Sequence, residues 1–225
     1  MFNFDIQTII GYLYAVPGIL FALSVHEFSH GWVADKLGDP TAKNSGRLTL
    51  NPSKHIDPIG LIAMFLVRVG WAKPVPVNTR YFKNAKRDTA LVALAGPMSN
   101  LISAFVGTLI YWALVIALSL KGVTSSMPVW DGILIILANF IYLNIGLAIF
   151  NLIPIPPLDG SRILDAFLPT KLYLAYHKYE QIIRIVLLAV LIFDIISIAP
   201  AVEAVSGAMN NVSLFICDKI YSLFV

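Results

Sequence analysis

Two histidines and a glutamate in the stretch SVHEFSHGW, residues 24–32, form the pattern His-Glu-x-x-His. On a helix, residues four apart lie on one face, so His26 and His30 can each direct a ring nitrogen at the same ion. Glu27 borders that face, where a general base can take a proton from a metal-bound water. The pattern therefore indicates a zinc site that activates water for hydrolysis.

The position of the motif strengthens this interpretation. It follows an apolar run that is long enough to enter a bilayer. An ionised glutamate in the middle of a spanning helix costs about 2.5–3.5 kcal/mol on insertion scales, and packing does not require it. The alternative is that these are ordinary core residues of an apolar helix with their hydrogen bonds made inside the protein. The cost of burying them makes this alternative weaker.

A catalytic zinc site takes three protein ligands and leaves a fourth position for water. Asp159 in the segment PPLDG is the best candidate for the third ligand, because the prolines end a predicted helix at the membrane depth expected for His30. Asp194 is expected nearer the opposite face of the membrane, whereas His55 and His177 are expected to be solvated. The alternative for Asp159 is a simple Asp-Gly turn residue.

The composition is that of an integral membrane protein. Hydrophobic residues make up 58% of the 225 residues and charged residues 13%, with a mean hydropathy of +0.78. One soluble core of this size could not cover so much apolar surface. We therefore expect an all-α polytopic membrane protein with about four transmembrane helices. They are predicted over residues 9–34, 89–120, 132–153 and 182–198.

Two further elements are predicted around these helices. Residues 46–78 contain turn formers, a short apolar run and two prolines, and they are expected to form a re-entrant or β-hairpin element after the first helix. Residues 201–225 are expected to form an interfacial amphipathic helix rather than another span. The whole chain, 1–225, is expected to be one intramembrane domain with its core at about 9–165.

Lysines and arginines predict the orientation of the chain. They are concentrated in residues 36–87 and 162–184, whereas Lys121 is the only one in the short connection between the second and third helices. The positive-inside rule places the two basic segments in the cytoplasm. Both HEFSH and PPLDG are then on the cytoplasmic side of the membrane.

Taken together, these segments resemble a known family. HEFSH on an early membrane helix, followed over a hundred residues later by NLIPIPPLDG (residues 151–160), is similar to the motif pair of the site-2 protease family of intramembrane zinc metalloproteases. AGPMSN (95–100), GRLTLNPSKHIDPIG (46–60) and AKPVPVN (72–78) resemble further elements of compact bacterial and archaeal members, which lack a PDZ or CBS domain. The resemblance covers about residues 20–165.

The resemblance implies that His26, His30 and Asp159 bind one Zn²⁺ per chain and that Glu27 is the catalytic base. It also implies that Asn151 is catalytic, as a donor to the substrate carbonyl or its oxyanion. The alternative for Asn151 is a cap on the broken helix. The expected reaction is hydrolysis of a peptide bond within or near a transmembrane segment of a membrane-protein substrate, in the plasma membrane of a prokaryote. No nucleic-acid partner is expected.

Two other functions remain open at this point. A membrane metal-binding protein or zinc transporter could use the same ligands, although their predicted clustering on one side of the bilayer disfavours transport. A catalytically inactive scaffold is disfavoured because the full set of site residues is present. For the protease, residues 71–78 could pair with an unwound substrate as an added strand, although Pro74 and Pro76 lack donors.

Overall fold

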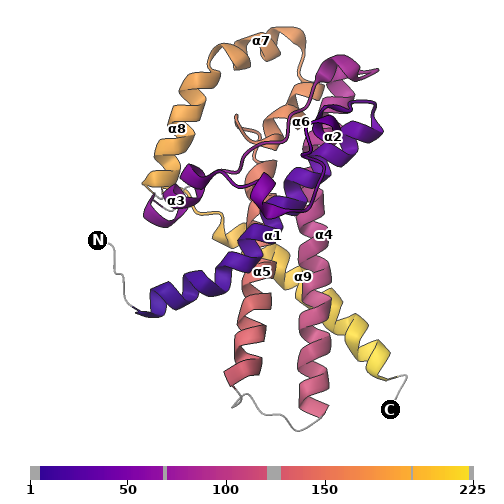
Figure 1. Cartoon of the computed structure of the whole chain (residues 1–225), viewed down its shortest axis with the longest axis vertical. Coiled ribbons are helices and arrows are strands. Elements are labelled where there is room, and N and C mark those ends of the chain that lie inside the picture. Colours follow the sequence, from indigo (N-terminus) through magenta and orange to yellow (C-terminus); the bar gives the residue numbers. More distant parts are fainter. Residues whose placement is uncertain (1–5, 68–69, 121–127, 194, 223–225) are drawn as a thin grey trace. The chain divides into compact units, whose positions relative to one another are not determined.

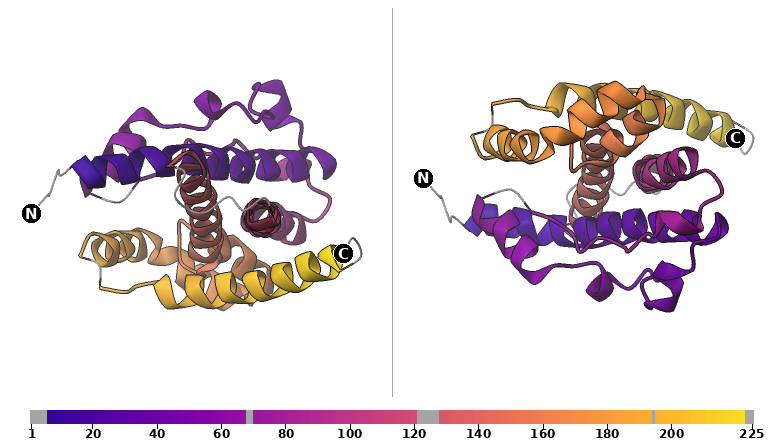
Figure 2. Two further views of the ribbon diagram at one scale, coloured as in Figure 1. Left: turned by 90° about the horizontal axis from the view of Figure 1, so that it is seen from below. Right: turned by 90° about the horizontal axis from the view of Figure 1, so that it is seen from above.

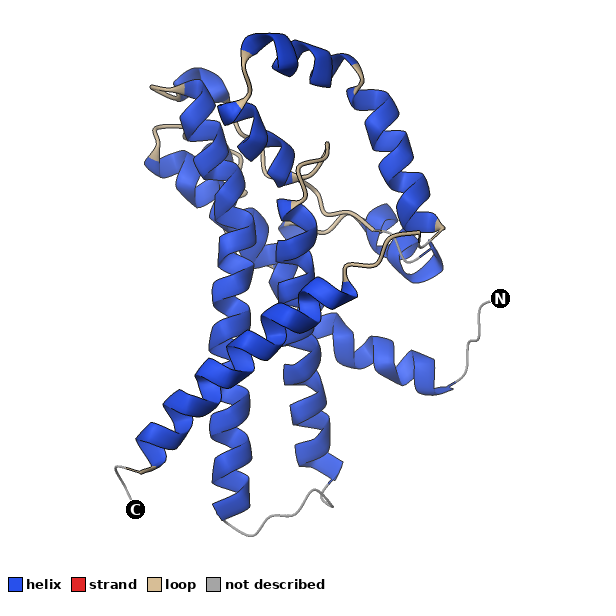
Figure 3. Ribbon diagram, turned by 180° about the vertical axis from the view of Figure 1, so that it is seen from behind, coloured by secondary structure: helices blue, strands red, loops and turns tan. Residues whose placement is uncertain are grey.

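The computed structural model describes residues 6–67, 70–120, 128–193 and 195–222. This part of the chain consists of helices and loops and contains no β-strand, as Figure 3 shows. The α-helices are α1 (Ile6–Lys36), α2 (Thr41–Asn44), α3 (Pro58–Val67), α4 (Ala85–Leu120), α5 (Pro128–Leu152), α6 (Asp159–Phe167), α7 (Thr170–Lys178), α8 (Glu180–Ile192) and α9 (Ala199–Tyr221). Short 3₁₀ turns are η1 (Pro52–Lys54) and η2 (Thr79–Tyr81). The predicted all-α class is confirmed.

Three of the described helices are long and apolar enough to cross a membrane: α1 from Ile9, α4, and α5 from Val129. They coincide with the first three predicted spans. Pro17 lies inside α1 and Pro97 inside α4. Membrane helices tolerate such prolines when neighbouring groups satisfy the freed backbone acceptors. The chain is an integral membrane protein.

The fourth predicted span, over residues 182–198, is not among the helices that could cross. Its apolar residues form α8, which has 13 residues. At a rise of about 1.5 Å per residue such a helix is about 20 Å long, shorter than the roughly 30 Å of a bilayer's hydrocarbon core. Asp194, which the prediction placed in this span, lies outside the described residues.

The β-hairpin predicted in residues 46–78 was also wrong. Helix α3 occupies its middle, and the flanks are joined by one isolated antiparallel bridge between Ile56 and Ala72. No longer ladder forms among the described residues, because the arm that contains Ile56 is the 3₁₀ turn η1 just before the bridge and becomes α3 just after it.

The chain divides into two compact units. The first unit combines α9 with parts of α1, α4 and α5 (residues up to 22, 100–146 and 199 onwards). In both views of Figure 2, α9 and this part of α1 lie on opposite sides of α4 and α5. Glycines permit the close contacts: a Cβ added at Gly18 would lie 3.1 Å from Phe140 Cα, and one at Gly107 would lie 2.9 Å from Phe140 Cε1.

Polar groups also join the helices of this first unit. The buried Asn100 amide donates to the Ala22 carbonyl at 3.0 Å and to Asn144 Oδ1 at 2.9 Å, which connects α4 to α1 and α5. Trp112 Nε1 donates to Asn210 Oδ1 at 2.9 Å, which connects α4 to α9. Inside a membrane protein such side-chain hydrogen bonds add to the van der Waals packing that holds helices together.

The second unit contains residues 23–99 and 147–198. It therefore includes every residue to which the sequence analysis assigned a role in a metal site. In Figure 1 its α6, α7 and α8 follow one another in orange after the end of α5. Ala34, Phe82 and Val92 form a buried apolar cluster that packs the end of α1 against the start of α4. This packing fixes the part of α1 that carries HEFSH.

Candidate metal centre

His26 and His30 lie one turn apart on α1, and both side chains are buried. Their ring centroids are 4.6 Å apart and the rings are nearly perpendicular. The third residue comes from α6, more than a hundred positions later: Asp159 is the first residue of that helix. The helix N-terminus is a favourable place for a carboxylate because the backbone N–H groups there are unpaired.

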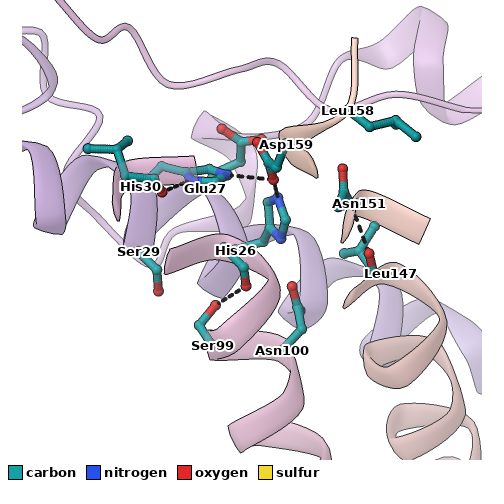
Figure 4. A network of polar contacts seen from close by, with 12 residues as sticks. His26, Glu27, Ser29, His30, Ser99, Asn100, Leu147, Asn151, Leu158 and Asp159 are labelled. Carbon is teal, nitrogen blue, oxygen red and sulfur yellow. Dashed lines mark hydrogen bonds and ion pairs between the residues drawn. The ribbon is translucent and has the colours of Figure 1, made fainter. Parts of the chain in front are cut away.

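The structure brings these three residues together, as Figure 4 shows. Asp159 Oδ2 lies 3.1 Å from His26 Nε2 and 3.2 Å from His30 Nε2. One potential ligand atom from each residue lies within 4.8 Å of the other two. Among the described residues this is the only group of three or more His, Cys, Asp or Glu with that geometry.

Two observations show that the cluster fits a zinc ion. Asp159 Oδ2 is buried and accepts no hydrogen bond from the described residues, although the Nε2 atoms of both histidines lie within ion-pair distance of it. His30 Nδ1 lies 2.7 Å from the Val92 carbonyl oxygen, so Nδ1 carries the proton and Nε2 presents a lone pair toward Asp159. Two imidazole nitrogens and a carboxylate oxygen are a ligand set that Zn²⁺ prefers.

Glu27 is also buried but is not part of this ligand group. Its Oε2 accepts a hydrogen bond of 2.7 Å from the backbone N–H of Val75. A carboxylate next to residues that could hold a metal, and not part of their group, can move a proton.

Asn151 lies in the last turn of α5 and is partly buried. Its side-chain nitrogen donates to the carbonyl of Leu147, one turn earlier in the same helix, at 2.9 Å (Figure 4). An amide NH₂ has two hydrogens, and the second has no partner among the described residues. The amide predicted as an oxyanion donor thus uses one of its two hydrogens inside its own helix.

Gly96 on α4 is a site residue that the sequence analysis did not identify. A Cβ added there would lie 2.5 Å from His30 Nε2 and 2.6 Å from His26 Cε1. The backbone of α4 therefore lies directly against both imidazoles, which is possible only without a side chain. The one signal is its place in the segment AGPMSN, whose small residues allow another helix to approach closely but do not identify that helix.

Gly160 follows Asp159 and has an equally tight environment. A Cβ added there would lie 2.3 Å from the Leu152 carbonyl oxygen and 2.5 Å from that of Ile153. We expect Gly160→Ala to lower the free energy of unfolding by about 1–3 kcal/mol, because rigid backbone must move to make room. Chemical unfolding in detergent measures this, and an unchanged midpoint would contradict the packing described here.

His55 corrects a prediction. It was expected to be solvated, but its side chain is fully buried. Its Nε2 donates to the Thr49 carbonyl at 2.6 Å, and its Nδ1 is buried without a hydrogen-bond partner among the described residues. The Thr49 acceptor lies six residues earlier in the chain, so the hydrogen bond holds the ring within its own turn rather than in solvent. His55 is not part of the group that could hold a metal.

His177 was also expected to be solvated, but it is partly buried between two carboxylates. Its Nε2 lies 3.0 Å from Asp165 Oδ2 on α6, and its Nδ1 lies 3.2 Å from Glu180 Oε2 on α8. Burial alone would lower the pKa of His177, but the hydrogen bonds to Glu180 and Asp165 outweigh it and raise the pKa above its ordinary 6.5. The Arg184 guanidinium, 2.8 Å from Glu180 Oε1, also faces this cluster.

This cluster predicts a pH dependence of stability. The pKa of His177 is raised in the folded state. Its favourable contribution to the free energy of unfolding is therefore fully present below about pH 6.5 and is lost as the pH rises through the folded-state pKa. We expect the thermal midpoint of the wild type to fall over this range relative to that of His177→Gln, which keeps hydrogen-bonding groups but does not titrate. A difference between the two proteins that is independent of pH would contradict this.

The sequence of the chain is similar to those of known proteins. The model of Peptidase family M50 matches residues 115–193, which include Asn151 and Asp159. YwhC of Bacillus subtilis (strain 168) is 43% identical over 156 residues, which cover 69% of each chain. No solved structure matches the chain.

Two more distant relatives have the same description. MJ0611 of Methanocaldococcus jannaschii is 32% identical over 167 residues, covering 72% of this chain and 73% of that protein. Rip2 of Mycobacterium tuberculosis (strain H37Rv) is 31% identical over 183 residues, covering 79% of this chain and 66% of the relative. All three relatives have names that describe zinc metalloproteases. The chain therefore belongs to peptidase family M50, the site-2 protease family of intramembrane zinc metalloproteases.

Proposed function

We propose that the chain cleaves a peptide bond within or near a transmembrane segment of a membrane-protein substrate, with His26, His30 and Asp159 as zinc ligands. The observation that carries the proposal is the position of Asp159 Oδ2, 3.1 Å and 3.2 Å from the two Nε2 atoms and without a hydrogen bond. The chemistry that bound zinc supplies in such a site is Lewis-acid activation of water and of the scissile carbonyl.

The side chains around the ligands have separate tasks in this proposal. Glu27 takes a proton from the attacking water and gives it to the leaving nitrogen. The second amide hydrogen of Asn151 is donated to the substrate carbonyl as negative charge develops on its oxygen. The Val92 carbonyl holds the His30 ring in the tautomer that leaves Nε2 unprotonated.

The site requires an unwound substrate. Every carbonyl of an intact transmembrane helix, apart from those of the last turn, is hydrogen-bonded within that helix, so it must open locally before water can attack. The ligands lie on α1 and at the start of α6, which follows the Pro-rich break after α5. We propose that this break admits water from the cytoplasmic side and that the protein resides in the plasma membrane of a prokaryote.

The elements outside the three candidate spans complete this proposed topology. With ten residues, α3 is too short to cross and is proposed to re-enter the same face of the membrane. Helix α9 carries Glu203, Asp218 and Lys219 among apolar residues and is proposed to lie at the membrane interface.

Proteoliposomes test the proposal. We expect purified protein with one zinc per chain to cleave a single-span reporter peptide in the same bilayer, and a chelator to abolish cleavage until zinc is returned. Zinc flux into the vesicles without cleavage would favour the transporter, and zinc binding with neither activity would favour an inactive scaffold.

A further inference from the structure

The carboxylate of Glu27 is held by a backbone amide from a distant segment. The N–H of Val75 donates to Glu27 Oε2 at 2.7 Å, across 48 residues of sequence. Both residues are buried, with 8% of Glu27 and 7% of Val75 exposed. No other hydrogen bond to the Glu27 carboxylate is present among the described residues. The orientation of this carboxylate therefore depends on the Val75 amide.

The segment that supplies this amide is held by hydrogen bonds before and after Val75. Two residues earlier, the N–H of Lys73 donates to the His55 carbonyl at 2.8 Å. Three residues later, the N–H of Asn78 donates to Oδ2 of Asp39, a fully buried carboxylate, at 2.6 Å. Val75 is thus placed between two backbone anchors.

The two residues that flank Val75 have no amide N–H of their own. Pro74 and Pro76 have no N–H, so Val75 provides the only donor of the Pro-Val-Pro triplet. Proline also restricts its own φ and the conformation of the preceding residue. A shift of the segment by one residue would place a proline opposite Glu27 and remove the hydrogen bond.

The side chain of Val75 also contacts the helix that carries Glu27. A Cβ added at Gly31 would lie 3.2 Å from Val75 Cγ1, so the valine packs directly on the backbone of α1. Gly31 is one helical turn after Glu27. The side chain and the amide of Val75 therefore contact two successive turns of α1.

We infer that Val75 is the positioning residue of the catalytic base: its amide holds Oε2 of Glu27 and leaves Oε1 for the attacking water. The inference rests on the proposed role of Glu27. A glutamate side chain has three rotatable bonds, and a misplacement of about 1 Å in an active site can cost about 100-fold in rate. Fixing one oxygen removes most of that freedom.

Proline substitution tests the amide directly. We expect Val75→Pro to lower kcat by about 10–100-fold, while KM and the zinc content stay at wild-type values, because only the base is released. The matched control is Val77→Pro, since the Val77 amide donates to no described residue. We expect kcat for Val77→Pro to stay close to that of the wild type. Equal loss of kcat in both variants, or a parallel loss of zinc in Val75→Pro, would overturn the inference.

Hydrogen exchange gives a second test that needs neither activity nor a substitution in the segment. We expect peptides covering residues 72–78 to lose the protection of one amide in Glu27→Ala and to keep it in Glu27→Gln, whose carbonyl oxygen still accepts. Identical exchange in the wild type and Glu27→Ala would overturn the inference. Wild-type cleavage by Glu27→Gln would instead refute the proposed role of Glu27 as the base, whatever the exchange result.

Discussion

Glu27→Gln is expected to lower kcat for reporter cleavage by about 10²–10⁴-fold, the range that general acid–base catalysis supplies. Glutamine has nearly the same shape and can still accept the hydrogen bond from Val75, but it cannot take a proton from water. Since Glu27 is outside the ligand group, bound zinc is expected to remain at one ion per chain. Rates in proteoliposomes and metal analysis of the same sample measure both quantities.

The matched comparison for this variant is Asp159→Asn. That substitution changes a residue of the ligand group and is expected to lower both activity and bound zinc, whereas Glu27→Gln lowers activity alone. Loss of zinc in Glu27→Gln would make Glu27 a ligand. Full activity of Glu27→Gln would show that another group accepts the proton.

Gly96→Ala is expected to weaken zinc binding by about 10–100-fold, the range seen when groups that orient metal ligands are changed. Its Cβ would lie 2.5 Å from His30 Cε1 and Nε2, so the imidazole cannot keep its position. The substitution adds one methyl group and no charge. Competition with a chelator of known affinity measures the loss.

Gly146→Ala is the control for this second substitution. Gly146 lies in α5, and a Cβ added there meets nothing within 4 Å. Alanine is also the better helix former, so unchanged or slightly higher stability and unchanged zinc affinity are expected. If Gly96→Ala bound zinc as tightly as Gly146→Ala, α4 would not lie against the histidines as described.

The sequence alone determined the helical class and the identity of the three helices that can cross a membrane. These features depend on local properties, namely long apolar runs and their helical periodicity. It also determined His26, Glu27 and His30 as one cluster, because residues one turn apart on a helix must share a face. Asp159 could be added because it stands at a Pro-rich helix break that the positive-inside rule places at the membrane depth of His30.

Only the tertiary structure decided which distant groups meet this cluster. No local feature of Gly96 shows that it lies against the imidazoles, and none of Val75 shows that its N–H donates to Glu27. The full burial of His55 likewise depends on its surroundings in the folded chain. The same limit explains why the described residues show neither a fourth span nor a hairpin: α8 is apolar but short, and the arm opposite Ala72 forms the 3₁₀ turn η1 beside the single bridge. Contacts between segments far apart in sequence depend on packing, which the local pattern of residues does not specify.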